Sequence, residues 1–279
     1  MAKWAKFFHA SRSGYYAYVE RRQCRQARQR TLKSQIKLIF DESGGTYGAA
    51  RICGVLRKSG VKASYAKVKN HMSDMGLKSI HARHKTRSLT DSKRARGGGY
   101  PNLLQGQTFK FPKTALCSDI TYLKTGEGWL YLCIIKDIAT GQILGAATSK
   151  TMKKELAIQT FLNAQARHKL PRGAILHSDR GSQYTSAAFM QTLKQYGIRQ
   201  SFSRVGKPCD NAWAESFFAT LKKECIHFKQ FATRDEIRQA VFAWTESFYN
   251  TRRVQARLGY MSPSEYVNFL CHQYEKSVA

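Results

Sequence analysis

The chain has 279 residues, with 47 Lys and Arg against 18 Asp and Glu, and its formal net charge is +29. The longest apolar run, residues 129–135, is far shorter than the roughly 20 residues that a membrane helix needs. The N-terminus lacks the apolar stretch of a secretory signal. The seven cysteines include no C-x-x-C pair, which argues against a disulfide framework or a zinc ribbon. We therefore expect a cytoplasmic protein of about two domains with no membrane segment.

The positive charge predicts a polyanionic partner, for which nucleic acid is the most common candidate. Residues 1–110 carry a net charge of +19 and residues 111–279 one of +10, so the front of the chain is the more basic part. The densest basic runs are residues 21–30 and 81–96, and neither forms an amphipathic helix with a wide apolar face, which disfavours an anionic membrane. We interpret residues 81–110 as a basic linker. A solvated basic surface without a specific ligand is the alternative.

Two short helices are predicted ahead of this linker. The first, within residues 47–60, places its apolar residues at helical spacing and ends at Gly60. The second has Ser64 as its N-cap and ends at Gly76. The pair suits a helix-turn-helix that lays its second helix in the major groove of DNA, although a plain helical hairpin gives the same pattern. We assign residues 1–80 to this helical region. Its candidate DNA contacts are Lys67, Lys69 and Asn70.

Strands alternate with helices from residue 111 onward. The predicted strands are residues 115–123, 129–138, 141–149, 174–179 and 198–203, and the predicted helices are residues 153–168, 186–197, 211–226 and 234–249. This order predicts an α/β sheet with helices packed on its faces. We assign residues 111–250 to this core and residues 251–279 to a basic helical C-terminal extension.

Three acids of this core, Asp119, Asp179 and Glu215, are candidates for the functional site, because ligands of α/β sheets bind at the carboxyl ends of strands. Asp119 lies within the first strand, Asp179 at the end of the fourth, and Glu215 in the helix after the fifth. A single carboxylate at such a position is more often a solvated or hydrogen-bonded group. Three together are suited to hold one or two hard divalent cations, which prefer oxygen ligands and promote in-line displacement at phosphorus.

The sequence also resembles a known family. HSDRGSQYTS (177–186), DNAWAESFFATLKKE (210–224) and SDITYL (118–123) are similar to the catalytic core of DDE transposases. The similarity is to the OrfB-type transposases of the bacterial insertion-sequence-three family, which are related to retroviral integrases. Thirty-five residues separate Asp179 from Glu215, the interval typical of that family. Residues 47–77 and YNTRRVQARLGYMSPSEY (249–266) resemble the family's helix-turn-helix and C-terminal signature.

This resemblance implies an RNase H-like fold in which Asp119, Asp179 and Glu215 bind metal. It implies two Mg²⁺ ions at this site, for which Mn²⁺ can substitute. It implies that Lys222 contacts DNA from the helix of Glu215. It further implies cleavage and strand transfer at the ends of an insertion sequence, on double-stranded DNA in the bacterial cytoplasm and at the nucleoid. Synapsis of two ends implies a homo-oligomer, and the family often fuses this chain to an upstream partner by ribosomal frameshifting.

Other residues of the core have two interpretations each. His177, two positions before Asp179 and on the same face of the strand, assists at the metal or is a hydrogen-bonded structural residue. Ser182, Gln183 and Tyr184 form a polar-aromatic loop beside Asp179. This loop is suited to phosphate contact, with Gln183 as the candidate DNA contact, or to stacking on an unpaired end base, or it is an ordinary helix-entry loop. Arg252 and Arg253 either bind phosphate or form a solvated cationic end of the core.

Further assignments concern packing and the family pattern. We expect Asp137 to cap a turn, Asp210 and Asn211 to cap the helix of Glu215, and Trp213 and Phe217 to lie in the core. Leu116 stands where the family usually has Trp, and Gln255-Ala256 stands where it usually has His-Ser. A non-catalytic DNA-binding regulator or domesticated copy is the alternative function. A repair nuclease would share the triad but leaves the helix-turn-helix and the C-terminal signature unexplained.

Overall fold

A computed structural model describes residues 11–82, 101–204 and 208–278. The chain divides into two compact units, residues 1–84 and 85–279. Nowhere in these described ranges does a helix have the length and apolar character needed to cross a bilayer.

The first unit is built from helices α2 (Arg12–Glu42), α3 (Ala49–Lys58) and α4 (Tyr65–Asp74), followed by the short 3-10 turn η1 (Ile80–Ala82). The predicted start of α4 is confirmed, because the Ser64 hydroxyl accepts a hydrogen bond from the Lys67 N–H at 3.3 Å. Gly60 and Gly76 both have φ near +70°, which ends α3 and α4 where the sequence predicted. The buried core of the unit includes Leu32, Ile36, Ile52, Leu56, Val68 and Met72.

Helix α2 is longer than the sequence pattern indicated. Its 31 residues include residues 12–22, a segment too short to be assigned to a helix from the sequence alone. The first half of α2 is exposed, whereas Leu32 and Ile36 in the second half are buried. Packing of these two side chains against α3 and α4 therefore fixes the C-terminal half of the helix.

The second unit contains a mixed five-stranded sheet in the order β3-β2-β1-β4-β5. Its strands are β1 (Ala115–Thr125), β2 (Gly128–Asp137), β3 (Ile143–Ser149), β4 (Ile175–Ser178) and β5 (Arg199–Phe202). β1, β2 and β3 form an antiparallel meander, whereas β4 pairs parallel to β1 and β5 parallel to β4. All five strands lie within a residue or two of their predicted positions.

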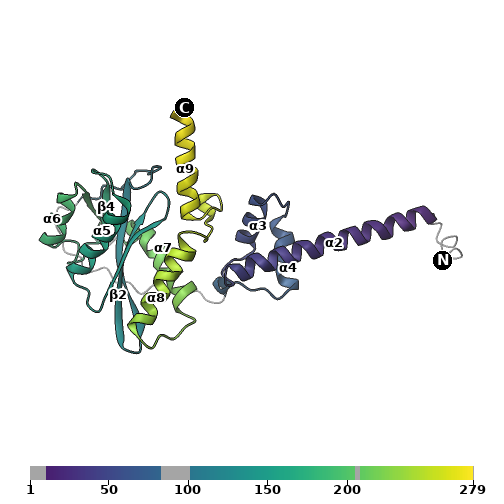
Figure 1. The fold of residues 1–279 in the computed structure, drawn as a ribbon, viewed down its shortest axis with the longest axis horizontal. Coiled ribbons are helices and arrows are strands. Elements are labelled where there is room, and N and C mark those ends of the chain that lie inside the picture. The colour runs from purple at the N-terminus through teal and green to yellow at the C-terminus, as the bar shows by residue number, and fades with distance from the viewer. Residues whose placement is uncertain (1–10, 83–100, 205–207, 279) are drawn as a thin grey trace. The chain divides into compact units, whose positions relative to one another are not determined.

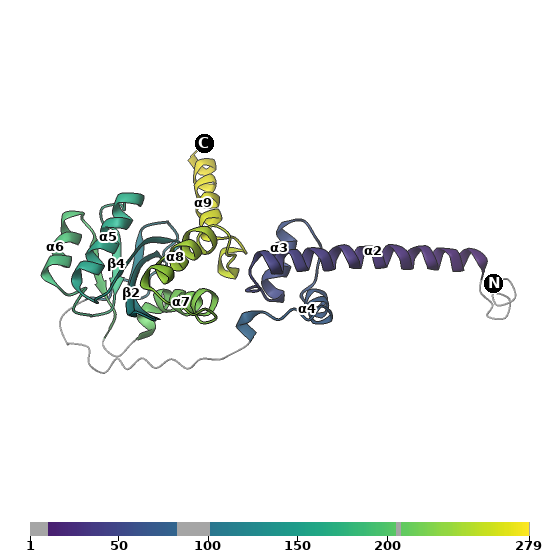
Figure 2. The same ribbon diagram turned by 60° about the horizontal axis from the view of Figure 1, so that its bottom comes forward.

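Helices cover both faces of this sheet, as Figures 1 and 2 show. Helices α5 (Lys154–His168) and α6 (Ala187–Gln195) pack on one face over a cluster that includes Leu116, Phe161 and Phe189. Helices α7 (Ala212–Leu221) and α8 (Arg234–Trp244) pack on the other, over a cluster that includes Leu132 and Phe217. The alternating side chains of β1 and β2 supply both clusters. The predicted α/β class, a mixed sheet with flanking helices preceded by a helical helix-turn-helix region, is confirmed.

The helices after β5 differ from their predicted form. The predicted helix 211–226 is α7 followed by a π-helical turn, η3 (Lys222–Ile226), and the predicted helix 234–249 is α8 followed by a second π-helical turn, η4 (Thr245–Tyr249). A π turn widens the helix by one residue and changes the direction of the side chains that follow. Hydrophobic periodicity does not reveal such a turn, because both segments remain helical.

The boundaries on either side of the core also differ in detail. Part of the predicted linker belongs to the core, since Leu104 is buried in it and the Leu103 N–H donates to the Ser201 hydroxyl. Residues 83–100 of that linker lie outside the described residues. At the other end, the buried Asn250 amide bonds both backbone groups of Ile143 on β3. Helix α9 (Pro263–Val278) follows the 3-10 turn η5 (Ala256–Leu258), and the arginines of residues 251–279 precede this helix.

Candidate active site

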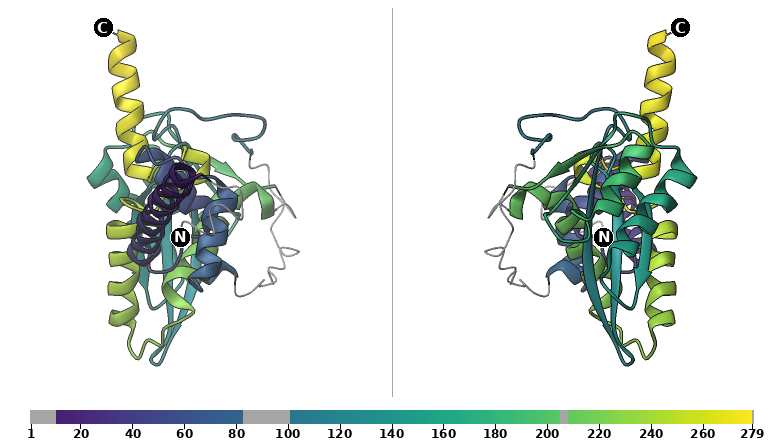
Figure 3. Two further views of the ribbon diagram at one scale, coloured as in Figure 1. Left: turned by 90° about the vertical axis from the view of Figure 1, so that its right-hand side faces the viewer. Right: turned by 90° about the vertical axis from the view of Figure 1, so that its left-hand side faces the viewer.

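The open edge of β1 provides the place for the candidate site. β1 has eleven residues, but the four-residue β4 pairs with it only from Ala115 to Cys117. Figure 3 shows the long hairpin of β1 and β2 reaching past the shorter strands. Asp119 therefore lies just beyond the paired part of β1, level with Asp179, which directly follows β4.

The two aspartates are electrostatically coupled there. Desolvation, and after it the negative charge of Asp179, raise the pKa of Asp119 to about 7. The Ile120 N–H donates to the Asp119 carboxylate at 2.8 Å, and this bond opposes the shift. Desolvation also raises the pKa of Asp179, against the lowering effect of the Gly181 N–H, which donates to it at 3.0 Å.

Glu215 reaches the same region from α7. Its charge raises the pKa of Asp119 too, by less than Asp179 does. Helix α7 is fixed beside β1 by the buried Asn211, whose side-chain amide donates to the Ser118 carbonyl at 3.1 Å. The structure thus brings the three predicted acids to one edge of the sheet, with the two aspartates most strongly coupled.

The predicted caps of α7 have other roles. Asn211 occupies the N-cap position, but its side chain makes no capping hydrogen bond and bonds β1 instead. The Asp210 carboxylate accepts from the backbone and guanidinium of Arg204 and from the Asn102 amide. Tertiary partners have replaced the local capping bonds, and they tie the start of α7 to β1 and to the end of β5.

Lys222 lies at the C-terminal end of α7, close to Asp119. Its positive charge lowers the pKa of Asp119, while desolvation lowers the pKa of Lys222 itself. Its ammonium also lies over the Tyr122 ring, 5.1 Å from the centroid, and Tyr122 packs edge to face on Trp129. These residues line a groove of about 810 Å³ with Lys124 and Lys229. The groove combines exposed aromatic rings with cations, a combination suited to a nucleic acid strand.

The donor set fits a hard divalent cation. Carboxylate oxygens are the ligands that Mg²⁺ prefers, and the mutual repulsion that raises the pKa of Asp119 is relieved by a bound cation. No three His, Cys, Asp or Glu side chains in the described part of the chain converge closely enough to hold an ion by themselves. Because Mg²⁺ usually takes one or two carboxylates together with substrate phosphate, this arrangement fits a site completed by a phosphate group of the substrate.

Comparison with known proteins identifies the family. Residues 111–208 and 196–263 each match the family described as Integrase core domain, and residues 26–85 match the HTH-like domain. The transposase for IS904 of Lactococcus lactis is 37% identical over 246 residues, which cover 88% of this chain and 96% of that protein. Transposase InsF for IS3A of Escherichia coli K12 is 35% identical over 268 residues, 94% of this chain and 92% of that protein. The chain belongs to the IS3 family of transposases.

Two solved structures are also similar in fold to this IS3-family transposase. One is a chain of the intasome of simian T-cell lymphotropic virus. The match covers 84% of this chain and 74% of the intasome chain, with 18% identity and a TM-score of 0.47. The catalytic core domain of BIV integrase matches 58% of this chain with 99% of its own length, 16% identity and a TM-score of 0.44.

The transposase uses His177 and Tyr184 as buried structural residues. The His177 ring bonds the hydroxyls of Ser201 and Ser203 at 2.9 and 3.1 Å, and desolvation lowers its pKa to about 4. These contacts favour the structural interpretation of His177. Tyr184 is 1% exposed and its hydroxyl bonds that of Ser118, which favours the interpretation of this segment as an ordinary helix-entry loop over stacking on a base. Gln183 remains partly exposed and donates to the Met152 carbonyl at 3.0 Å.

The two arginines near the C-terminal signature have different surroundings. Arg252 is exposed, and its guanidinium lies 6.0 Å from the centre of the Phe248 ring. Arg253 is buried and donates two hydrogen bonds to the buried carboxylate of Glu224. This buried pair places Arg253 in neither of its predicted surroundings, phosphate or bulk solvent.

Predictions on the remaining side chains have clear positions in the structure. Lys67, Lys69 and Asn70 are exposed on α4, around the buried Val68. Asp137 caps the β2–β3 turn, as predicted, by accepting from the Ala139 N–H and the Thr140 hydroxyl. Phe217 is buried and Trp213 partly buried in the core, also as predicted. Sequence reasoning missed Asn211 as the link to β1 and Tyr122 as the partner of Lys222, since each pairs residues about 100 positions apart.

Proposed function

We propose that this transposase cuts and joins DNA strands at the ends of an insertion sequence, and that Asp119, Asp179 and Glu215 are its catalytic, metal-binding residues. The observation that carries the proposal is the coupling of three carboxylates, from β1, β4 and α7, at the open edge of the sheet. Two Mg²⁺ ions, or Mn²⁺ in their place, would activate the attacking oxygen and stabilise the leaving oxygen.

The chain's own residues position the DNA. Lys222, next to Asp119, neutralises phosphate beside the scissile bond, and Tyr122 and Trp129 offer ring faces for bases along the adjoining groove. The partly exposed Gln183 and the exposed Arg252 are secondary candidates for phosphate contact. On α4, Lys67, Lys69 and Asn70 bind duplex DNA through the major groove.

Replacing Glu215 by Gln tests the assignment. The variant keeps the size of the side chain but loses the charge, so we expect strand cleavage and joining to fall at least a hundredfold while DNA affinity changes less than twofold. Cleavage is measured with Mg²⁺ or Mn²⁺ on DNA bearing the element's ends, and affinity by fluorescence anisotropy. Glu155→Gln, at an exposed position on α5, is the matched control. Undiminished cleavage by Glu215→Gln would contradict the proposal.

Metal-dependent nicking of DNA distinguishes a transposase from the alternative, a non-catalytic DNA-binding regulator. Only the transposase nicks DNA in a metal-dependent way, and Asp179→Asn must abolish that nicking. A regulator binds DNA with the same salt dependence but shows no nicking in any variant.

We also propose that the protein works in the bacterial cytoplasm as a homo-oligomer, because two element ends have to be held together for strand transfer. An upstream partner fused by frameshifting is part of the same proposal. Light scattering of the DNA complex tests the oligomeric state. The DNA sequence on either side of the gene tests for the upstream partner and for the element ends. Inverted repeats with an overlapping upstream frame support it, whereas their absence indicates an orphaned copy.

A further inference from the structure

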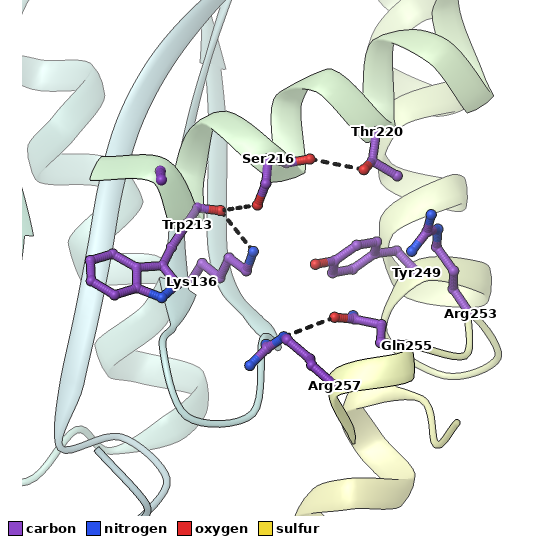
Figure 4. A pocket seen from close by; sticks show the side chains of 9 residues that line it. Lys136, Trp213, Ser216, Thr220, Tyr249, Arg253, Gln255 and Arg257 are labelled. Atoms are coloured by element: carbon purple, nitrogen blue, oxygen red, sulfur yellow. Dashed lines mark hydrogen bonds between the residues drawn. The ribbon is translucent and has the colours of Figure 1, made fainter. Parts of the chain in front are cut away.

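A small cationic pocket lies apart from the three acids. It has a volume of about 260 Å³ and lies between the end of β2, helix α7 and residues 249–257 (Figure 4). Pockets that enclose whole drug-sized ligands measure roughly 300–1,000 Å³, so this one suits a single small group. Lys136 and Tyr249 point toward one another across it, with Gln255 and Arg257 below them in the view.

The charge in this pocket is unbalanced. Lys136, Arg253 and Arg257 contribute three cations to its lining, and no carboxylate lines it. Glu224 already compensates Arg253. The buried Lys136 ammonium donates to the Trp213 carbonyl at 2.7 Å, and Arg257 donates to backbone carbonyls of the β2–β3 turn. Neither Lys136 nor Arg257 forms an ion pair among the described residues, although burial of an ammonium is costly without an anion.

A buried hydrogen-bond donor lies in the same pocket. The Gln255 side-chain oxygen accepts from Arg257, which leaves its amide nitrogen buried and without a hydrogen-bond partner among the described residues. An unsatisfied buried donor usually marks a missing acceptor. Gly141, with φ +74°, leaves the space that Arg257 occupies, because a Cβ there would lie 2.1 Å from the guanidinium. The donors are therefore held in place by the fold.

We propose that this pocket binds one phosphate group of the DNA backbone, through Lys136, Gln255 and Arg257. Phosphate supplies both the negative charge that the two cations lack and the acceptor oxygens that the Gln255 amide lacks. Ser216 and Arg257 at the rim are exposed, so a phosphate within a polymer can enter without being enclosed. This inference rests on the proposed function for its choice of DNA, while the pocket chemistry alone would also take free phosphate.

The test uses Gln255→Glu and Arg257→Gln in the full-length protein. Gln255→Glu keeps the shape and the oxygen that Arg257 needs, but it places a carboxylate where the phosphate would lie. Thermal unfolding is measured in inorganic phosphate and in KCl of the same ionic strength. We expect phosphate to raise the Tm of the wild type beyond the effect of KCl, and this extra rise to be lost in both variants. Without phosphate, Gln255→Glu should be at least as stable as the wild type.

A second measurement identifies the source of the phosphate. Each phosphate contact adds about one to the slope of log affinity for duplex DNA against log salt concentration, so Arg257→Gln should lower that slope by about one. Lys194→Gln, which removes an exposed cation on α6, is the matched control and should leave both measurements unchanged. A lost phosphate effect with an unchanged DNA slope assigns the pocket to free phosphate and overturns the DNA proposal. Equal effects of phosphate and KCl overturn the pocket itself. Neither readout requires cleavage, so failure here is distinct from failure of the Glu215 assignment.

Discussion

At the scale of single residues, the buried pair of Arg253 and Glu224 has the largest expected effect on stability. Their side chains are 6% and 0% exposed. Removing one partner leaves the other charge buried and uncompensated, so Arg253→Met and Glu224→Leu should each cost about 3–5 kcal/mol, and the double variant less than their sum. Unfolding in urea measures this. Arg252→Met, at the exposed neighbour, should change stability by less than about 0.5 kcal/mol. Additive losses in the double variant would refute the pairing.

Asp210 should make stability depend on acid pH. The hydrogen bond from Arg204 is the main cause that lowers its pKa from 3.8 to about 2. A folded pKa below the unfolded value gives stability that is present above about pH 4 and is lost as the pH falls through about 2. Asp210→Asn should therefore be less stable than the wild type at pH 6, with the difference shrinking between pH 4 and 2. Tm values across that range test this, and a constant difference would contradict it.

At the scale of elements, Asn250 takes the place of a neighbouring strand for part of β3. Its amide bonds the Ile143 N–H at 2.9 Å and the Ile143 carbonyl at 3.0 Å, all in the core. Asn250→Ala leaves both backbone groups buried and unpaired, which should cost about 2–5 kcal/mol. The matched control is Asn163→Ala, because Asn163 donates to the Ala146 carbonyl of the same strand at an exposed position, where water replaces the bond. Equal losses in the two variants would count against this role of Asn250.

At the scale of the whole molecule, the proposed major-groove contacts and the proposed catalytic acids lie in different compact units. Lys69 is exposed on α4, whereas the three acids lie in the second unit. Lys69→Gln should weaken DNA binding and lower the salt slope by about one, while metal-dependent nicking at saturating protein stays within about twofold. Lys37→Gln is the control, since its ammonium already pairs with Asp41 on α2. A fall in nicking that saturation does not restore would show that the two units are coupled.

The sequence by itself determined the class of fold and the ends of α3 and α4, and it singled out three candidate acids. Alternating apolar residues in residues 115–149 define strands, and Gly60, Ser64 and Gly76 define helix ends, because these signals act within a few residues of the chain. The acids became candidates because a family pattern, with the typical spacing of Asp179 and Glu215, is visible in the linear sequence.

Only the tertiary structure decided which side chains share an environment. Tyr184 and Arg253 resembled ligand contacts in the sequence, but packing buried one against Ser118 and the other against Glu224. The links from Asn211 to β1 and from Gln255 to Arg257 and the pocket depend on how strands and helices meet. Their energies come from burial and from partners distant in the chain, and neither spacing nor composition encodes that information.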